Sequence, residues 1–471
     1  MVDNMEANTP DILKEDPKES IMKIAVPIMV TMIITTLYNI IDGMWITGLG
    51  INAITGISLI TPLFTIINGV ATGLGNGIIS TINRFREEYG NDSASTVASQ
   101  AIVISIVISI GLTIVLFLSL NSYLSIYGGS YLVNKEAFSY ANPLFLGLTG
   151  FVLPIIFSNI LRAEGDTKRS MYALSLGLIL NAILDPVFIY TLKLGPAGAS
   201  ISTILTSILS GLIMYYWIFI KKDISTKINI KKVLKSKWDW FITKDILKTG
   251  IPASLVLFVL SLSTGVYYVF INLVGGGLGI SIYSSGYRIY LLGVMPITSI
   301  SNALVILISS FYGSKNIKFL KRAHTYGTIS AFNISLLVCA IFFIFSDQIA
   351  SIFMVTTNYP PLTEGISQFV SITAFCLPFL GLGLPSAYLY QGTGKAYMSL
   401  FWTIMSELIC VIPAVYIIVF YFHAGLIGIW TAFVVGRAIS NILNLIYARI
   451  YIHKLEKNLD FELVENYNIN Y

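Results

Sequence analysis

The chain has 471 residues, of which 55% are hydrophobic and 11% are charged, and its formal net charge is +5. Because a soluble domain carries about 25% charged residues, this composition excludes an ordinary soluble protein. The positive net charge does not indicate nucleic-acid binding, because the positions of the basic residues along the chain explain it better. The apolar segments run for about 20 residues without alternation, which excludes a transmembrane barrel and leaves room for about a dozen helical spans.

The N-terminal segment, residues 1–21, is predicted to be a tail outside the membrane. The first 23 residues contain six acids, whereas a signal peptide begins with basic residues followed by a short apolar core. We therefore expect a cytoplasmic tail and no signal peptide.

Twelve apolar spans follow, in two sets of six. The sequence predicts an N-terminal lobe over 22–220, a linker over 221–245, a C-terminal lobe over 246–452 and a cytoplasmic tail over 453–471. The expected spans are 22–48, 53–82, 95–120, 136–162, 170–192, 197–220, 246–272, 280–311, 322–346, 363–390, 396–420 and 425–452. The fold class predicted is an all-α membrane protein.

Basic residues predict the orientation of these spans. Of the 29 lysines and arginines, 25 lie in the even-numbered connections, the linker and the two tails. Positive residues concentrate on the cytoplasmic side of membrane proteins. Both termini are therefore expected in the cytoplasm of a multi-pass plasma-membrane protein.

The two halves resemble each other weakly at a separation of 227 residues. Gly165, Lys168, Met171, Pro186 and Gly198 correspond to Gly392, Lys395, Met398, Pro413 and Gly425. Six spans in each half give both halves the same orientation, a parallel repeat found in secondary transporters. Asp185 corresponds to Ile412, so only the first half keeps this charge.

Two acids inside spans of the first half are the main candidates for function. An acid at the bilayer centre costs about 2.5–3.5 kcal/mol on insertion scales, which makes it a functional-site hypothesis. Asp42 follows Tyr38 and Asn39 by four and three residues, and Asp185 follows Asn181 by four, so each group can share one helix face. An alternative is that each acid caps a neighbouring helix.

Thr203 begins the sixth span and adds a hydroxyl to the same half. Two carboxylates, an amide oxygen and a hydroxyl form an oxygen-rich set that suits a hard cation or a shared proton. The sequence leaves Na⁺ and H⁺ open as the ion held by Asp42, Asn181, Asp185 and Thr203.

Three further residues inside spans have competing interpretations. Glu407 is either a substrate contact or a second proton site, or it extends toward the membrane surface or pairs with Arg437. Pro27 removes a helical hydrogen bond from the first span and predicts either a static kink or a functional bend. Arg288 either packs between helices in an ion pair or forms part of a cavity wall, and packing is favoured.

The sequence contains no enzyme signature. There is no phosphate-binding loop, GxSxG or HExxH motif, and the three cysteines lie singly in apolar segments without metal or redox spacing. We expect no enzymatic activity and no cofactor other than the coupling ion.

The segments PIMVTMIITTLYNIIDGMWITGLG, LRAEGDTKRSM, NAILDPVFIYTLKLGPAGAS and GTGKAYMSL resemble those of MATE (multidrug and toxic compound extrusion) transporters of the archaeal and bacterial branch. The resemblance covers about residues 20–452. It implies twelve helices in two six-helix lobes arranged as a V, a central cavity, and antiport of drugs against a cation.

The resemblance also implies roles for individual residues. It places the cation site at Asp42, Asn181, Asp185 and Thr203, with Tyr38 and Tyr140 near it, and a bend of the first helix at Pro27. Another branch carries acids in helices 7 and 10, which have no interior acid here. Glu407 departs from the family pattern.

We therefore expect a secondary antiporter that exports amphipathic, cationic small molecules by alternating access in exchange for H⁺ or Na⁺, as a monomer in the lipid bilayer. One alternative is a flippase for lipid-linked precursors, which would need a strongly basic cavity to hold diphosphates. Only Arg288 and Arg437 lie within spans. A membrane-embedded enzyme is a third hypothesis and lacks any metal or nucleophile cluster.

Overall fold

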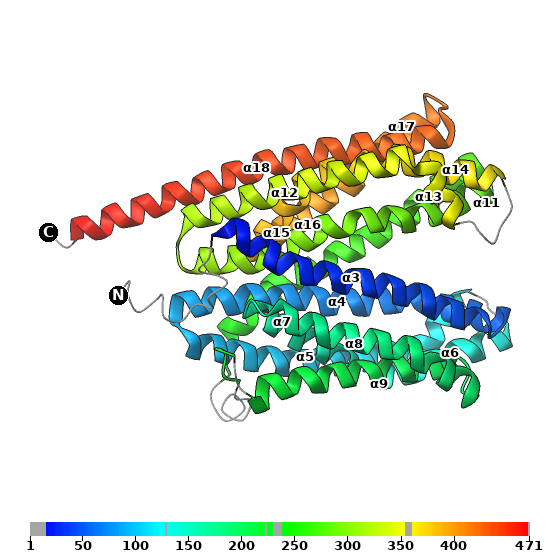
Figure 1. Ribbon diagram of the computed structural model, residues 1–471, viewed down its shortest axis with the longest axis horizontal. Coiled ribbons are helices and arrows are strands. Elements are labelled where there is room, and N and C mark those ends of the chain that lie inside the picture. Colours follow the sequence, from blue (N-terminus) through cyan, green and yellow to red (C-terminus); the bar gives the residue numbers. More distant parts are fainter. Residues whose placement is uncertain (1–15, 128–129, 222–223, 229–237, 354–359, 470–471) are drawn as a thin grey trace. The chain divides into compact units, whose positions relative to one another are not determined.

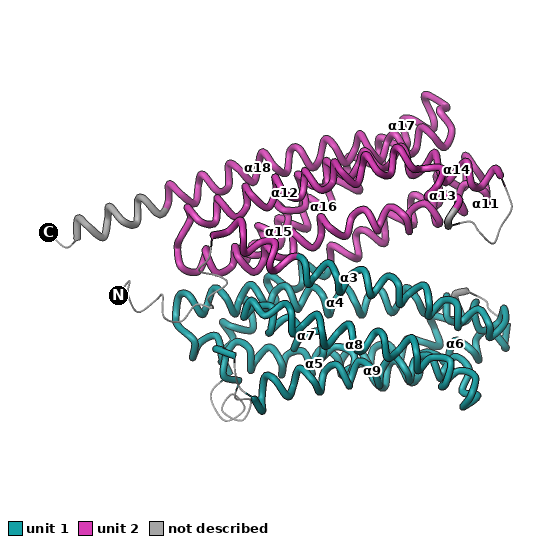
Figure 2. The backbone as a smooth tube through the Cα atoms, viewed as in Figure 1, with its two compact units in different colours: residues 1–14, 26–254 teal, residues 15–25, 255–471 magenta. Residues whose placement is uncertain are grey.

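The computed structural model describes residues 16–127, 130–221, 224–228, 238–353 and 360–469. Most of the predicted N-terminal tail and much of the predicted linker fall outside these residues. The described chain forms two compact units, one of which contains Val26–Ser254 and the other Leu255–Tyr471 with the segment around residues 15–25 (Figure 2).

The N-terminal unit consists of long apolar helices joined by short turns (Figure 1). Its helices are α3 (Pro17–Thr47), α4 (Ile51–Tyr89), α5 (Asn91–Tyr127), α6 (Tyr131–Leu146), α7 (Leu148–Ala163), α8 (Thr167–Pro186) with the π-helix η1 (Val187–Thr191), and α9 (Pro196–Tyr215) with η2 (Tyr216–Lys221). Within this unit α8 packs against α9, and α9 also contacts α6 and α7.

The C-terminal unit repeats this plan. Its helices are the later part of α11 (Trp240–Gly313), then α12 (Ile317–Ile344), α13 (Ser346–Phe353), α14 (Pro360–Thr373), α15 (Cys376–Gly392), α16 (Ala396–Ile404), η3 (Met405–Val411), α17 (Ile412–Phe420) and α18 (Gly425–Ile469). The short helix α13 has no counterpart among the predicted spans.

The described residues contain the twelve predicted spans. Nine helices are individually long and apolar enough to cross a membrane, and two bent pairs, α6 with α7 (51°) and α14 with α15 (49°), add two more. The twelfth arises because α11 has 74 residues and breaks at Gly276, where φ is 56°. A helix of that length would extend roughly 110 Å, far more than the roughly 30 Å core of a bilayer, so α11 supplies two spans.

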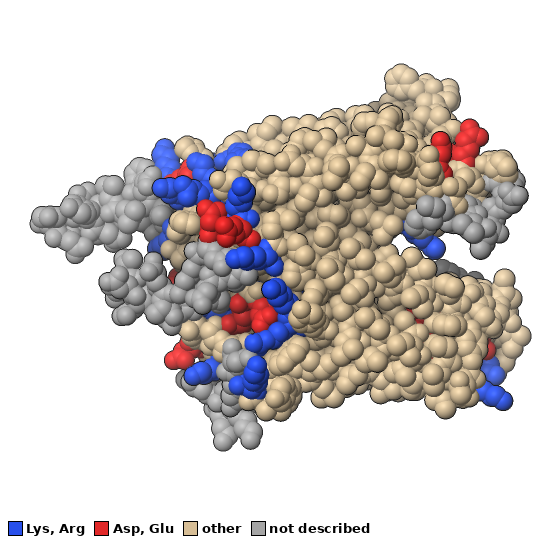
Figure 3. Space-filling view, in the orientation of Figure 1, with Lys and Arg blue, Asp and Glu red and all other residues tan. Residues whose placement is uncertain are grey.

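The turn at Gly276 confirms the predicted connection between the seventh and eighth spans. A positive φ is accessible to glycine because it lacks a Cβ atom. The predicted helical class is confirmed as well. The charged side chains visible in Figure 3 gather at the helix ends of each unit and leave an uncharged middle, as a bilayer requires.

The repeat differs in register between sequence and structure. The left-handed turn glycine of the first half is Gly165 (φ 75°), directly before α8, and that of the second half is Gly394 (φ 74°), directly before α16. These positions are 229 residues apart, whereas the sequence pairs Gly165 with Gly392. The structure therefore pairs Gly165 with Gly394, and the sequence pairing of Gly165 with Gly392 is wrong by two residues.

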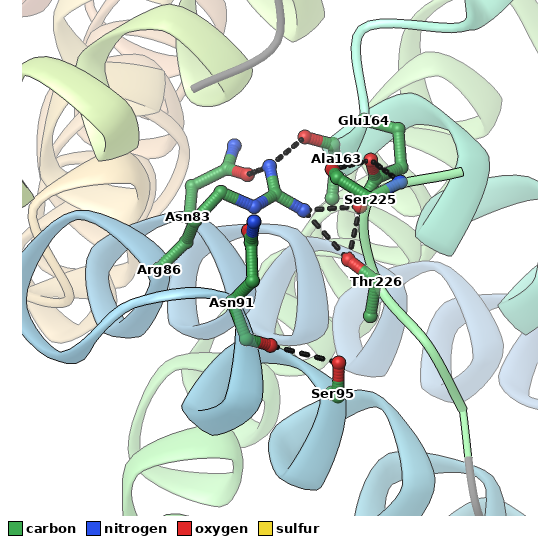
Figure 4. Close-up of polar contacts among 8 residues, drawn as sticks. All are labelled: Asn83, Arg86, Asn91, Ser95, Ala163, Glu164, Ser225 and Thr226. Atoms are coloured by element: carbon green, nitrogen blue, oxygen red, sulfur yellow. Dashed lines mark hydrogen bonds and ion pairs between the residues drawn. The ribbon is translucent and has the colours of Figure 1, made fainter. Parts of the chain in front are cut away.

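The segment after η2 is fixed to the N-terminal unit by a buried ion pair (Figure 4). Arg86, at the end of α4, pairs with Glu164, the residue that ends α7. Glu164 also accepts hydrogen bonds from the backbone N–H of Ser225 (3.1 Å) and from the hydroxyls of Ser225 and Thr226. Arg86 donates to Thr226 Oγ1 (2.8 Å) and to the Ala163 carbonyl (3.0 Å).

Candidate functional site

The N-terminal unit brings two acids from different helices together. Asp42 comes from α3 and Asp185 from the last turn of α8, where Pro186 and the π-helix η1 interrupt regular hydrogen bonding. π-Helical segments are frequent at functional sites. The two carboxyl groups lie close enough to act electrostatically on each other, and Asp185 is completely buried.

Asn181 orients the carboxyl group of Asp185. Its side-chain N–H donates to Asp185 Oδ1 (3.0 Å) and to Ser202 Oγ on α9 (2.7 Å). The predicted pairing of Asn181 and Asp185 on one helix face is therefore present. The sequence analysis missed Ser202, although its neighbour Thr203 lies in the same GASIST segment, because one face of α9 cannot be chosen from the sequence alone.

Asp185 Oδ2 is buried and has no hydrogen-bond donor among the described residues. A buried carboxylate oxygen without a donor is costly, and the nearby acid Asp42 is another carboxyl group. The pair therefore suits a proton or a small cation between the two side chains. The described residues contain no group of three or more His, Cys, Asp or Glu that would form a site for a more highly charged metal ion.

Thr203 and Tyr38 form the edge of the site. Thr203 donates its hydroxyl hydrogen to the Ala199 carbonyl (3.0 Å) and interacts with the side-chain hydroxyl of Tyr38. Tyr140, from α6, lies close enough to act electrostatically on both acids. Asn39 is exposed on α3, and its place beside the substrate cavity stays a prediction.

Two aromatic residues connect α3 to the end of α8. The indole N–H of Trp45 donates to the Ala182 carbonyl (3.2 Å), and the Tyr190 hydroxyl donates to the Trp45 carbonyl. Their rings meet edge to face, with centroids 6.4 Å apart. Sequence reasoning assigned no role to Trp45, because a tryptophan near a span end ordinarily marks the membrane interface.

The first helix passes Pro27 without interruption, since α3 is helical from Pro17 to Thr47. The carbonyl of Pro27 accepts a hydrogen bond from the Thr31 hydroxyl (3.0 Å). A hydrogen bond from a threonine hydroxyl to the carbonyl four residues earlier gives that backbone oxygen an additional donor near a proline, and it leaves the helix able to bend. Pro27 therefore does not end the helix, and its role as a kink or a functional bend stays a prediction.

Glu407 occupies a different environment in the C-terminal unit. It lies in η3, with its carboxylate 3.2 Å from both Nε and Nη2 of Arg437, and Tyr267 donates its hydroxyl hydrogen at 2.6 Å. Phe433 and Tyr290 lie under the guanidinium group, with centroids 5.6 and 5.7 Å away. Of the alternatives for Glu407, the structure therefore shows the pair with Arg437.

The other arginine within a span, Arg288, is exposed. Arg437 is committed to Glu407, so it does not contribute to the basic cavity that a flippase for diphosphates would need.

Comparison with known proteins agrees with this arrangement. The MatE family profile matches residues 27–187 and 252–417, one match in each half. The chain is 25% identical to a probable multidrug resistance protein NorM of Thermotoga maritima, covering 93% of this chain and 92% of the relative. It is 24% identical to the multidrug export protein MepA of Staphylococcus aureus, covering 88% and 89%.

A solved structure of a multidrug resistance MATE family transporter in an outward-facing conformation superimposes with a TM-score of 0.91 at 31% identity. The match covers 95% of this chain and 98% of that one. Since the profile spans most of both halves and the structural match covers nearly the whole chain, this protein belongs to the MatE family.

Proposed function

We propose that this protein is a secondary active multidrug exporter that expels amphipathic, cationic compounds in antiport with H⁺ or Na⁺. Family membership supports the transport activity. The observation that carries the coupling assignment is the pair formed by Asp42 and Asp185, two carboxyl groups that face each other, with one buried oxygen that has no donor.

The carboxyl pair is suited to coupling because its two states differ in charge. With a proton or Na⁺ between them, Asp42 and Asp185 attract the same ion; without it, two negative charges repel each other in a poorly solvated site. Release of the ion therefore favours separation of α3 from α8, and binding favours their approach. Asn181, Ser202 and Thr203 supply the remaining oxygen atoms for Na⁺.

The driving force is adequate for this exchange. One charge that crosses 100 mV contributes about 2.3 kcal/mol, and a tenfold ion gradient adds about 1.4 kcal/mol. When one ion is exchanged for one monovalent cation, no net charge crosses the membrane, so the ion gradient alone drives export and supports about a tenfold concentration difference. Each further ion exchanged adds both contributions, about 3.7 kcal/mol or roughly 500-fold. No nucleotide is needed for transport on this scale.

We also propose that the protein resides in the plasma membrane as a monomer with both termini in the cytoplasm. The excess of lysine and arginine in the connections that lie on one side supports this orientation. Substrates of this class are recognised largely by apolar and aromatic surface, with few polar contacts.

The test is efflux of a fluorescent cationic dye from proteoliposomes, with a Na⁺ gradient and a pH gradient imposed separately. We expect one gradient to drive efflux and thereby identify the coupling ion. Absence of transport under both gradients, for a panel of amphipathic cations, would contradict the proposal. Binding of an undecaprenyl-type lipid in place of the dye would favour a flippase.

A further inference from the structure

A pocket of about 550 Å³ lies at one end of the C-terminal unit, where the turn between α11 and α12 meets the late part of α18. It is lined by Lys315, Asn316, Ile317, Lys318, His453, Glu456 and Lys457. The pocket is remote in sequence from the acid pair of the N-terminal unit, and the proposed transport mechanism does not use it.

The pocket carries positive charge that its own acid does not neutralise. Lys321 binds Glu456 with Nζ 2.9 and 3.1 Å from the two carboxylate oxygens, so the charge of the acid in the lining is already matched. Lys318 and Lys457 are both exposed, and neither forms an ion pair with any residue that the structure describes. The pocket therefore favours an anion.

The start of α12 adds to this preference. Asn316 caps the helix, accepting a hydrogen bond from the backbone N–H of Phe319 at 3.2 Å. Ile317 and Lys318, the first two residues of this 28-residue helix, form part of the pocket wall. The positive end of the helix dipole therefore lies beside the lysines, an arrangement that suits phosphate oxygens.

An exposed apolar strip leads from the pocket along α18. His453 and Lys457 continue a stripe that contains Ile446 and Ile450, at spacings of three and four residues that place all four on one helix face. Ile446 and Ile450 are 51% and 48% exposed. Beside them α12 is held to α18 by the hydrogen bond from Arg449 to Thr325 (2.8 Å). The charged pocket thus adjoins an apolar strip, just as the charged headgroup of a phospholipid adjoins its acyl chains.

We propose that this pocket binds the phosphate group of an anionic phospholipid, whose acyl chains lie along the exposed face of α18. Lys318 and Lys457 hold the phosphate, and Ile446 and Ile450 contact the chains. A basic pocket between helices at the membrane edge is a known arrangement for such headgroups. Free phosphate shares the headgroup chemistry but gains nothing from the apolar strip.

The experiment measures binding of phosphatidylglycerol to the purified full-length protein in neutral detergent, by native mass spectrometry or fluorescence titration. The pocket variant is K318Q/K457Q. Each lysine near an anionic lipid contributes about 1 kcal/mol, so we expect roughly thirty-fold weaker binding. The matched control, K168Q/K248Q, removes two exposed lysines from the N-terminal unit and should leave the affinity unchanged.

Two results would overturn the proposal. Equal weakening in the pocket variant and the control would show that the lipid responds only to overall charge. Inorganic phosphate that binds as tightly as phosphatidylglycerol would assign the pocket to a free anion. Phosphatidylcholine, which lacks the net negative charge, should bind weakly to all three proteins if the proposal is correct.

Discussion

The two units bury carboxyl groups in opposite electrostatic settings. In the N-terminal unit Asp42 faces Asp185, and the residues that orient the pair are neutral amides and hydroxyls. In the C-terminal unit Glu407 faces Arg437, and Tyr267 and Tyr290 complete a neutral cluster. Both acids lie at or beside a π-helix in corresponding parts of the repeat, Asp185 before η1 and Glu407 within η3.

The difference suggests a division of labour between repeats. An acid pair without an arginine needs an exchangeable cation to become neutral, whereas an acid with its own arginine needs none. The N-terminal unit is therefore suited to ion coupling and the C-terminal unit to a fixed structure. Mutations that remove one acid of the N-terminal pair, or one or both partners of the C-terminal ion pair, test that interpretation.

The largest expected effect follows from Asp185→Asn. This change removes one of the two charges that require an ion, so gradient-driven efflux should fall to the rate of protein-free liposomes. The folded protein should persist, because Asn181 and the new amide can still hydrogen bond, and size-exclusion chromatography checks this. Retained coupled efflux would remove the acid pair from the mechanism.

Glu407→Gln is the matched change in the other unit. Leaving Arg437 buried without its acid should cost about 3–5 kcal/mol of stability, measured as a lower unfolding temperature in detergent. The ion that drives efflux should stay the same. If Glu407→Gln instead loses ion coupling while unfolding at the normal temperature, then Glu407 belongs to the transport site and the comparison fails.

The variant Glu407→Leu/Arg437→Met separates charge from packing. Replacing both partners by apolar residues of similar size leaves no unpaired charge, so most of the lost stability should return. A double variant no more stable than the single one would mean that the tyrosine contacts, rather than the ion pair, hold the cluster together.

The turn before the fifth span provides a second contrast. Glu164 binds Arg86 and the residues after η2, while the side chain of its structural counterpart in the second half, Thr393, hydrogen bonds to Tyr390 and Tyr451. Glu164→Gln should weaken the hold on residues 224–228 by about 1–3 kcal/mol. Hydrogen exchange there should be roughly five- to hundredfold faster, and Thr393→Ala should leave it unchanged.

Much of the fold and part of the site could be predicted from sequence, because both depend on strong local signals. Long apolar segments identified the twelve spans, and the cost of burying an acid identified Asp42 and Asp185. The pairing of Glu407 with Arg437 could not be chosen among its alternatives, since it depends on how η3 is rotated toward α18. Such rotations are set by packing between helices, which a single sequence does not record.

The contacts around Glu164 and Trp45 were missed for a related reason. Ser225 and Thr226 are common residues whose hydroxyls acquire a role only because Arg86 and Glu164 already lie beside them. The two-residue shift of the repeat, from Gly392 to Gly394, is visible only in the backbone angles. Sequence patterns identify which residues are unusual, and tertiary packing decides which ordinary residues they meet.

The smallest expected effect concerns the aromatic contact that holds α3 against α8. Trp45→Phe removes the hydrogen bond from the indole to the Ala182 carbonyl while keeping an aromatic ring near Tyr190. A neutral hydrogen bond contributes about 1 kcal/mol, so the affinity for the coupling ion should fall by up to about fivefold. The ion dependence of dye efflux measures this, and Tyr190→Phe should act in the same direction because it removes the second link. The C-terminal pair needs no added ion, since Arg437 on α18 already neutralises Glu407 on η3. An unchanged ion affinity in both variants would mean that the acid pair positions itself without this contact, and that Asn181 and Ser202 alone set its geometry.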